Sequence, residues 1–265
     1  MVLKNLDELY FSQSALAIFK KCRRRFRYRY LDGLYWPSEW GMADEVSEDL
    51  ERGRLFHLLA ERYFSRTLGS TVLEDNNLLQ AWLNRLKNYC PDQGVISAEQ
   101  EIRFRSGEVR MLAKYDLLKY DEQNKLLQIY DWKTDKKSLY SRDLKESMQS
   151  RFYLYLMAEA GDKYFSRDYE IKNLPQLIYW NPRYADEELL ISYSEADFKK
   201  DRKFFADLTS EIKAEEEFPL TEDLNICRYC EYRPICRGKV QEGRELYEED
   251  LELELNWESV EEMEW

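Results

Sequence analysis

The sequence predicts a fold that combines a short β-sheet with flanking helices, of the α/β or α+β class. Two patterns predict it. Apolar residues recur at helical spacing in residues 12–31, 48–68, 76–90 and 194–217, whereas residues 98–134 alternate as strands do. With 265 residues and 44% hydrophobic residues, the chain can bury one sizeable core.

The helices before the sheet have recognisable ends. Ser12 or Ser14 can cap the first helix, and Cys22 is expected inside it. The third helix stops before Pro91, which places Cys90 at its C-terminal end.

Residues 98–134 predict three antiparallel strands, with turns at 106–108 and 121–124. We expect a helix over residues 143–161 that ends at Gly161 and a further strand within 171–181. An amphipathic helix over 194–217 precedes the cysteine-rich segment. No internal repeat or flexible linker interrupts this order, so we expect one domain over residues 1–242.

Charge is distributed unevenly along the chain. The net charge is -12, but residues 243–265 hold ten acidic residues and one Arg, and the remaining 242 residues have a net charge of only -3. We expect the acidic segment to be a disordered tail. In the body, "KKCRRRFRYRY" places seven Lys or Arg among eleven residues, interleaved with aromatics. Arg24, Arg25 and Arg27 could contact DNA phosphates, or the stretch could be a solvated helix face.

Composition also bounds the cellular setting. No apolar run is long enough to span a membrane, and the N-terminal residues lack the apolar core of a secretory signal, so we expect a cytoplasmic protein without a membrane partner. Five cysteines are too few for a disulfide scaffold, and clustered cysteines in a reducing compartment are more often metal ligands.

Two carboxylates and a lysine are predicted to meet at one edge of the sheet. The tight turn at 121–124 places Asp116 of one strand beside Asp131 of the next. Lys133 lies two residues beyond Asp131 and points to the same face, while Trp132 points into the core. Paired acidic oxygens suit Mg²⁺ or Mn²⁺, and a lysine can stabilise developing charge at a phosphodiester. The other interpretation is a surface ion pair.

Other polar residues are weaker candidates. His57, the one histidine of the chain, lies on a partly apolar helix and could be packed rather than catalytic. Gln149 and Tyr153 share one helix face and could contact phosphate or the lysine, or have ordinary surface roles. Glu99 and Glu101 alternate on one face of the first predicted strand, and either could be a further acid or merely solvated.

Three cysteines, Cys227, Cys230 and Cys236, lie within ten residues, one short of a closed four-ligand metal site. The fourth ligand could be Cys22 or Cys90, and spacing alone leaves both open. It also leaves zinc and iron–sulfur open, although zinc sites more usually show two close pairs.

In chain order, six stretches together resemble the RecB-type branch of the PD-(D/E)XK nucleases: "SQSALAIFKKCRRRF", "GRLFH", "AKYDLL", "YDWKT", "QSRFYLYL" and "CRYCEYRPICR". More narrowly, they resemble the branch with an iron–sulfur cluster, which includes the AddB nuclease domain and the CRISPR-associated adaptation exonucleases. The resemblance implies a restriction-endonuclease-like central mixed sheet flanked by helices, and a metal-dependent DNA nuclease that acts as an exonuclease.

The resemblance also implies roles for residues. His57, Asp116 and Asp131 would hold the catalytic Mg²⁺ or Mn²⁺, with the backbone carbonyl of Trp132 available to it, and Lys133 would be the catalytic lysine. Gln149 and Tyr153 would help to position the DNA backbone.

The same resemblance places one cysteine in the N-terminal helix, which fits Cys22 and leaves Cys90 a bystander. A [4Fe–4S] cluster on Cys22, Cys227, Cys230 and Cys236 would then join the N- and C-terminal segments, with Zn²⁺ as the alternative.

The chain departs from the family pattern at two positions. Arg23 follows Cys22 where the family often has Pro, and Lys114 lies two residues before Asp116 where the family often has Gly. Neither change removes a ligand. The sequence has no phosphate-binding GxxxxGK[ST] motif, so we expect a stand-alone nuclease or a subunit that works with a helicase or with other repair or adaptation subunits. A noncatalytic DNA-binding or assembly subunit and a CRISPR adaptation nuclease are the alternatives, and the oligomeric state stays open.

Overall fold

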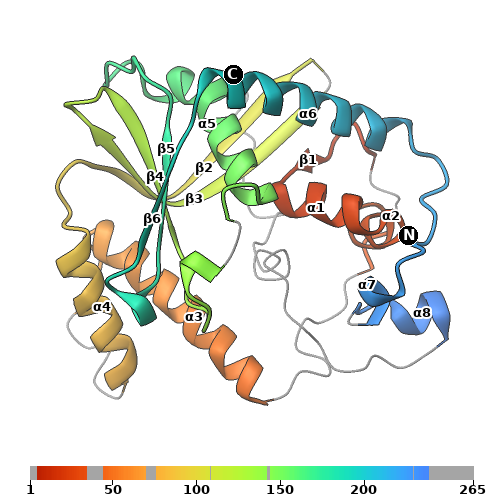
Figure 1. Cartoon of the computed structure of the whole chain (residues 1–265), viewed down its shortest axis with the longest axis horizontal. Coiled ribbons are helices and arrows are strands. Elements are labelled where there is room, and N and C mark those ends of the chain that lie inside the picture. Colours follow the sequence, from red (N-terminus) through yellow and green to blue (C-terminus); the bar gives the residue numbers. More distant parts are fainter. Residues whose placement is uncertain are drawn as a thin grey trace.

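The fold is seen in a computed structural model of the chain (Figure 1), which describes residues 5–34, 44–69, 76–107, 109–141, 144–228 and 230–238. The segment 243–265 lies outside the described residues. The strands are β1 (Tyr10–Phe11), β2 (Val95–Ser106), β3 (Val109–Asp121), β4 (Leu126–Trp132), β5 (Gln176–Trp180) and β6 (Glu188–Ser192). The α-helices are α1 (Gln13–Lys21), α2 (Arg23–Phe26), α3 (Asp44–Phe64), α4 (Asn77–Tyr89), α5 (Met148–Phe165), α6 (Glu195–Ala214), α7 (Leu224–Arg228) and α8 (Arg233–Arg237). Short π- and 3₁₀-helical segments are η1 (Arg27–Leu31), η2 (Leu139–Ser141) and η3 (Pro182–Tyr184).

The strands form one mixed sheet with β3 at its centre. One edge of β3 pairs antiparallel with β2. The other edge pairs in parallel with β1 at its start and antiparallel with β4 at its end. β5 then adds in parallel to β4, and β6 adds antiparallel to β5. The three predicted antiparallel strands and the mixed α/β class are therefore confirmed.

Helices flank the sheet in two groups (Figure 1). α1, α5 and α6 contribute to one apolar core, where the rings of Phe152 and Phe205 lie 5.3 Å apart. α3 and α4 contribute to a second, where the rings of Phe56 and Trp82 lie 5.8 Å apart. No described helix is long and apolar enough to cross a membrane.

The expected helix over 12–31 is wrong in one respect, because it is broken at Cys22. Cys22 has an extended backbone with φ -156° and ψ 110°, and α2 starts at the next residue. The N–H of Arg24 donates to the carbonyl oxygen of Pro219 (3.2 Å), so the C-terminal segment takes a hydrogen bond that a continuous helix would use. Cys22 therefore lies at a break between two helices and not within one.

The expected helix end at Gly161 is also wrong, since α5 continues to Phe165. A β-carbon on Gly161 would lie 2.8 Å from Met157 Sδ and 3.1 Å from Leu127 Cδ1. The glycine thus allows α5 to pack closely on β4. Neither β1, which has two residues, nor β6 is expected from the sequence patterns.

Candidate active site

The site lies where β3 and β4 diverge. The ladder between them begins at Leu117 and Tyr130, next to Asp116 and Asp131. Asp116 Oδ2 accepts a hydrogen bond from the backbone N–H of Trp132 (2.7 Å). This side-chain hydrogen bond joins β3 to β4 beyond their last backbone pair. Two carboxylates therefore share this end of the strand pair.

Asp131 belongs to a closed network with Lys133 and Gln149. Lys133 Nζ donates to Gln149 Oε1 (2.6 Å) and lies 3.1 Å from Asp131 Oδ2. Gln149 Nε2 donates to Asp131 Oδ1 (2.8 Å), which closes the triangle. The ammonium also lies 5.0 Å from the ring centroid of Tyr179 on β5. This network holds Lys133 in one position, while Trp132 between the two polar residues is buried in the second core, as the strand alternation predicts.

A second set of ligand atoms gathers on the other side of Asp116. His57 Nδ1 on α3 lies 3.2 Å from Asp116 Oδ1. His57, Asp116 and Glu99 each offer one ligand atom, and these three atoms all lie within 4.8 Å of one another. An imidazole and two carboxylates are a suitable donor set for Mn²⁺ or Mg²⁺.

The sequence did not distinguish Glu99 from Glu101. Glu101 contacts Arg103 Nε (2.6 Å) further along β2, whereas Glu99 reaches His57 and Asp116. The backbone of Glu99 distinguishes it, because its φ is 52°. The order of residues along the strand does not predict this angle.

Burial and charge shift the pKa values of these groups. Burial lowers the pKa of His57, but the charge and hydrogen bond of Asp116 outweigh it and raise this pKa to about 9. Burial raises the pKa of Asp116, but His57 and the Trp132 N–H reverse that effect and lower it. Burial raises the pKa of Asp131 to about 7, against the opposing charge of Lys133. In the metal-free protein at neutral pH, the imidazole is therefore the hydrogen-bond donor to Asp116.

Comparisons with known proteins identify the family of the chain. The family model of the PD-(D/E)XK nuclease superfamily matches residues 10–94 and 91–237. The chain belongs to this superfamily. A crystal structure from Eubacterium rectale, described as a "putative exonuclease", has a TM-score of 0.51 with 11% identity over 93% of this chain and 94% of that one, a likeness of fold. A second crystal structure, of the protein SSO0001, has a TM-score of 0.42 with 18% identity over 90% of each chain. No curated protein matches the sequence.

One predicted site residue, Tyr153, does not belong to the network of Lys133, Asp131 and Gln149. Tyr153, one turn after Gln149 on α5, is only 5% exposed, and its ring packs on that of Tyr115 with centroids 4.9 Å apart. Gln149 thus joins Lys133 and Asp131 directly, while Tyr153 lies mainly in the core.

Arginines of the basic stretch "KKCRRRFRYRY" make contacts within the protein. Arg25 is 3% exposed and forms an ion pair with Glu231, with Nη2 2.9 Å from Oε2. Arg24 Nε donates to the carbonyl oxygen of Phe218 (2.7 Å). Arg27 lies 3.5 Å from Asp32 and stays about one third exposed. Because the guanidinium of Arg25 is buried, it has no surface for a phosphate. This burial argues against its predicted DNA contact. For Arg24 and Arg27 that contact stays a prediction.

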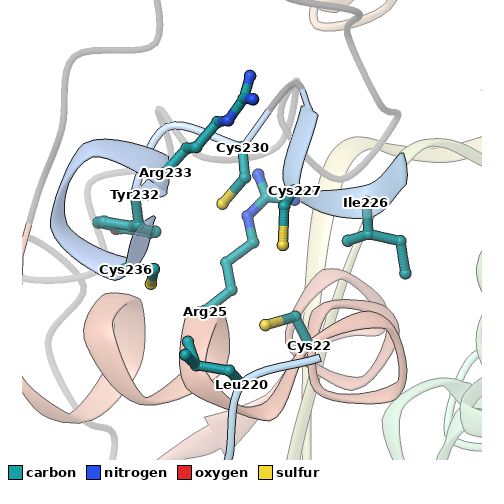
Figure 2. A pocket seen from close by; sticks show the side chains of 9 residues that line it. All are labelled: Cys22, Arg25, Leu220, Ile226, Cys227, Cys230, Tyr232, Arg233 and Cys236. Atoms are coloured by element: carbon teal, nitrogen blue, oxygen red, sulfur yellow. The ribbon is translucent and has the colours of Figure 1, made fainter. Parts of the chain in front are cut away.

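The cysteines converge as the resemblance implies. Cys22, Cys227, Cys230 and Cys236 line one pocket between the α1–α2 break and α7–α8, together with Arg25 (Figure 2). Burial raises the pKa of the Cys230 thiol to about 12, and the nearby Glu231 charge adds to this effect.

Cys90 lies elsewhere. It is buried in the second core, with α4. Its sulfur lies 3.8 Å from Lys119 Nζ. Of the two candidates for a fourth cysteine in the pocket, the fold brings Cys22 and not Cys90.

Proposed function

We propose that the chain is a divalent-metal-dependent DNA nuclease of the RecB-type branch that acts as an exonuclease. One observation carries the proposal: Lys133, Asp131, Asp116 and His57 come together where β3 and β4 diverge, in a chain of the PD-(D/E)XK superfamily.

The residues of this site fit a hard divalent ion. His57, Asp116 and Asp131 would hold Mg²⁺ or Mn²⁺, with the carbonyl of Trp132 as a further oxygen ligand. When bound, such an ion polarises a phosphodiester and lowers the pKa of a water. Lys133, fixed by Gln149 and Asp131, would present a positive charge beside the scissile phosphate, where charge develops during hydrolysis.

A cleavage assay on end-labelled single-stranded and duplex DNA tests this function. We expect degradation with Mg²⁺ or Mn²⁺, none with EDTA, and a loss of about a hundredfold or more for Asp116→Asn. Glu122→Gln, in the exposed turn after β3, is the matched control and should cleave as the parent does. Purified protein that binds DNA without cleaving it under any of these conditions would favour the noncatalytic subunit instead.

We also propose that the cysteine pocket holds a [4Fe–4S] cluster that joins the N- and C-terminal segments. The four thiols share one pocket, as a four-thiolate site requires. A single Zn²⁺ is the alternative, because a tetrahedral zinc site also accepts four thiolates.

Metal analysis separates these alternatives. Anaerobically purified protein should be brown and contain about four irons per chain. Cys22→Ala should lose iron as completely as Cys230→Ala, and Cys90→Ala should keep it. Colourless protein with one zinc per chain would replace the cluster by Zn²⁺, and loss of metal from Cys90→Ala alone would overturn the ligand set.

The remaining expectations concern partners. We propose DNA as the substrate and a helicase or another repair or adaptation subunit as a working partner, on the ground that the sequence has no nucleotide-binding motif of its own.

A further inference from the structure

A second lysine lies at the edge of the proposed metal site. Lys114 is two residues before Asp116 on β3, and residues two apart on a strand point to the same face. Its Nζ lies 2.5 Å from Glu99 Oε2, across the β2–β3 pair. Lys114 and Glu99 are partly exposed, at 31% and 18%, so solvent ions can reach them.

Glu99 is held in an unusual backbone conformation. Its φ of 52° is left-handed, although it lies within β2 and its neighbours Ala98 and Gln100 pair regularly with Leu117 and Tyr115. L-residues rarely adopt this conformation, and where they do the surrounding structure holds them there. At Glu99 the result is a carboxylate beside His57 and Asp116.

The same carboxylate therefore faces two cations, the ammonium of Lys114 and any divalent ion held by His57 and Asp116. An ammonium and a metal ion compete for carboxylate oxygens because each is stabilised by the same negative charge. We propose that Glu99 is an additional ligand of the divalent ion, and that Lys114 is its counter-ion in the metal-free protein and is displaced when the ion binds. This inference rests on the proposed function, since it concerns the same metal site.

The test is a titration of Mn²⁺ into metal-free protein without DNA, with free Mn²⁺ followed by electron paramagnetic resonance. Glu99→Gln should weaken Mn²⁺ binding about tenfold or more. Glu101→Gln is the matched control, because it removes the same charge from the same strand at a carboxylate paired with Arg103, and it should change affinity much less. Lys114→Met should strengthen Mn²⁺ binding, because the ammonium that competes with the metal ion for the oxygens of Glu99 is removed.

A double-variant cycle gives the decisive result. The gain from Lys114→Met should vanish in the Glu99→Gln background if the lysine acts through Glu99. An equal gain in both backgrounds would reduce Lys114 to a general positive charge and overturn its role as counter-ion. Equal affinities for Glu99→Gln and Glu101→Gln would overturn Glu99 as a ligand.

Folding and the parent proposal are controlled separately. Circular dichroism and melting verify that each variant folds, and Glu99→Asp serves if Glu99→Gln does not, since the shorter side chain should also weaken binding. Asp116→Asn should abolish Mn²⁺ binding. If it does while Glu99→Gln has no effect, only this inference fails. If Asp116→Asn binds Mn²⁺ as the parent does, the proposed metal site itself is wrong.

Discussion

Gly53 on α3 lies so close to Thr134 that a β-carbon on the glycine would be 2.7 Å from Thr134 Oγ1. The two residues belong to the parts of the chain that carry the site, because His57 is one helical turn after Gly53 and Thr134 directly follows Lys133. The missing side chain thus sets how closely α3 approaches the end of β4, and with it the distance between the imidazole and the sheet carboxylates.

Gly53→Ala should move α3 away from β4 and displace His57. A steric conflict of this kind costs about 1–3 kcal/mol of folding free energy, and we expect both a lower melting temperature and weaker Mn²⁺ binding. Thr134→Ala removes the conflicting oxygen, so the double variant should recover both properties. Full metal affinity in Gly53→Ala alone would show that the close contact does not position His57.

Lys133→Ala should lower the rate of DNA cleavage about a hundredfold or more, because it removes the one positive charge that the Gln149 network holds at the site. DNA binding should change little, and circular dichroism should verify that the variant stays folded, because Asp131 loses its ion pair. Lys137→Ala, an exposed lysine four residues later, is the matched control and should keep the parent rate. Single-turnover cleavage measures both, and a Lys133→Ala rate within a fewfold of the parent would remove the lysine from the proposed chemistry.

Metal affinity should depend on pH through His57. Because the pKa of His57 is raised to about 9 in the metal-free protein, this imidazole carries a proton at neutral pH that it must release to bind a metal. Affinity for Mg²⁺ should therefore rise by about tenfold per pH unit between the pKa of Asp131, about 7, and that of His57, and level off above the pKa of His57. Below the pKa of Asp131 the rise should be steeper, because this carboxyl must then also lose a proton. Calorimetry in buffers of different ionisation enthalpy should detect the released proton. An affinity that is flat from about pH 6 to about pH 8 would contradict the ligand role of His57.

Part of this site could be read from the sequence because a strand repeats every two residues. The tight turn fixes the pairing of β3 with β4, and pairing places Asp116 beside Asp131 and turns Lys133 to the same face. A tight turn and the two-residue repeat of a strand together determine which side chains meet. Trp132 follows from the same rule, and its burial agrees with it.

The rest depends on contacts between distant parts of the chain. At the break after α1, the N–H of Arg24 donates to Pro219, nearly two hundred residues away. A glycine at position 161 predicts a helix end from its residue type, but in the structure it allows close packing on Leu127. Glu99 and Glu101 differ in their partners across the β2–β3 pair, and Glu99 also has a left-handed backbone that the fold imposes. Propensity and periodicity cannot report such contacts, because both describe neighbours along the chain.

The same limit applies to the basic stretch, whose composition suggests a DNA-binding surface. Arg24 and Arg25 contact the C-terminal segment. The buried Arg25–Glu231 pair is joined by Arg29, whose Nη1 lies 3.5 Å from Glu231 Oε1. Tyr232 OH adds a hydrogen bond to the carbonyl oxygen of Leu34 (2.5 Å). These contacts connect the two segments through groups other than the cysteines.

Arg25→Met should therefore act on stability rather than on DNA affinity. It leaves Glu231 with a weaker partner in a buried position, and breaking a buried ion pair typically costs about 3–5 kcal/mol. The double variant Arg25→Met with Glu231→Leu should be less destabilised than the sum of the single variants, because both members of the buried Arg25–Glu231 pair are then replaced by apolar residues. Denaturant unfolding measures both.

The control for this prediction is the salt dependence of DNA binding, measured at a temperature where every variant is folded. Arg25→Met should keep the parent slope, because a buried guanidinium releases no counterion when DNA binds. Arg27→Gln, at a partly exposed arginine of the same stretch, should flatten the slope by about one ion if it contacts a phosphate. A flatter slope for Arg25→Met with unchanged stability would mean that Arg25 leaves Glu231 to meet DNA, and the stretch would then be a nucleic-acid surface as its composition suggests.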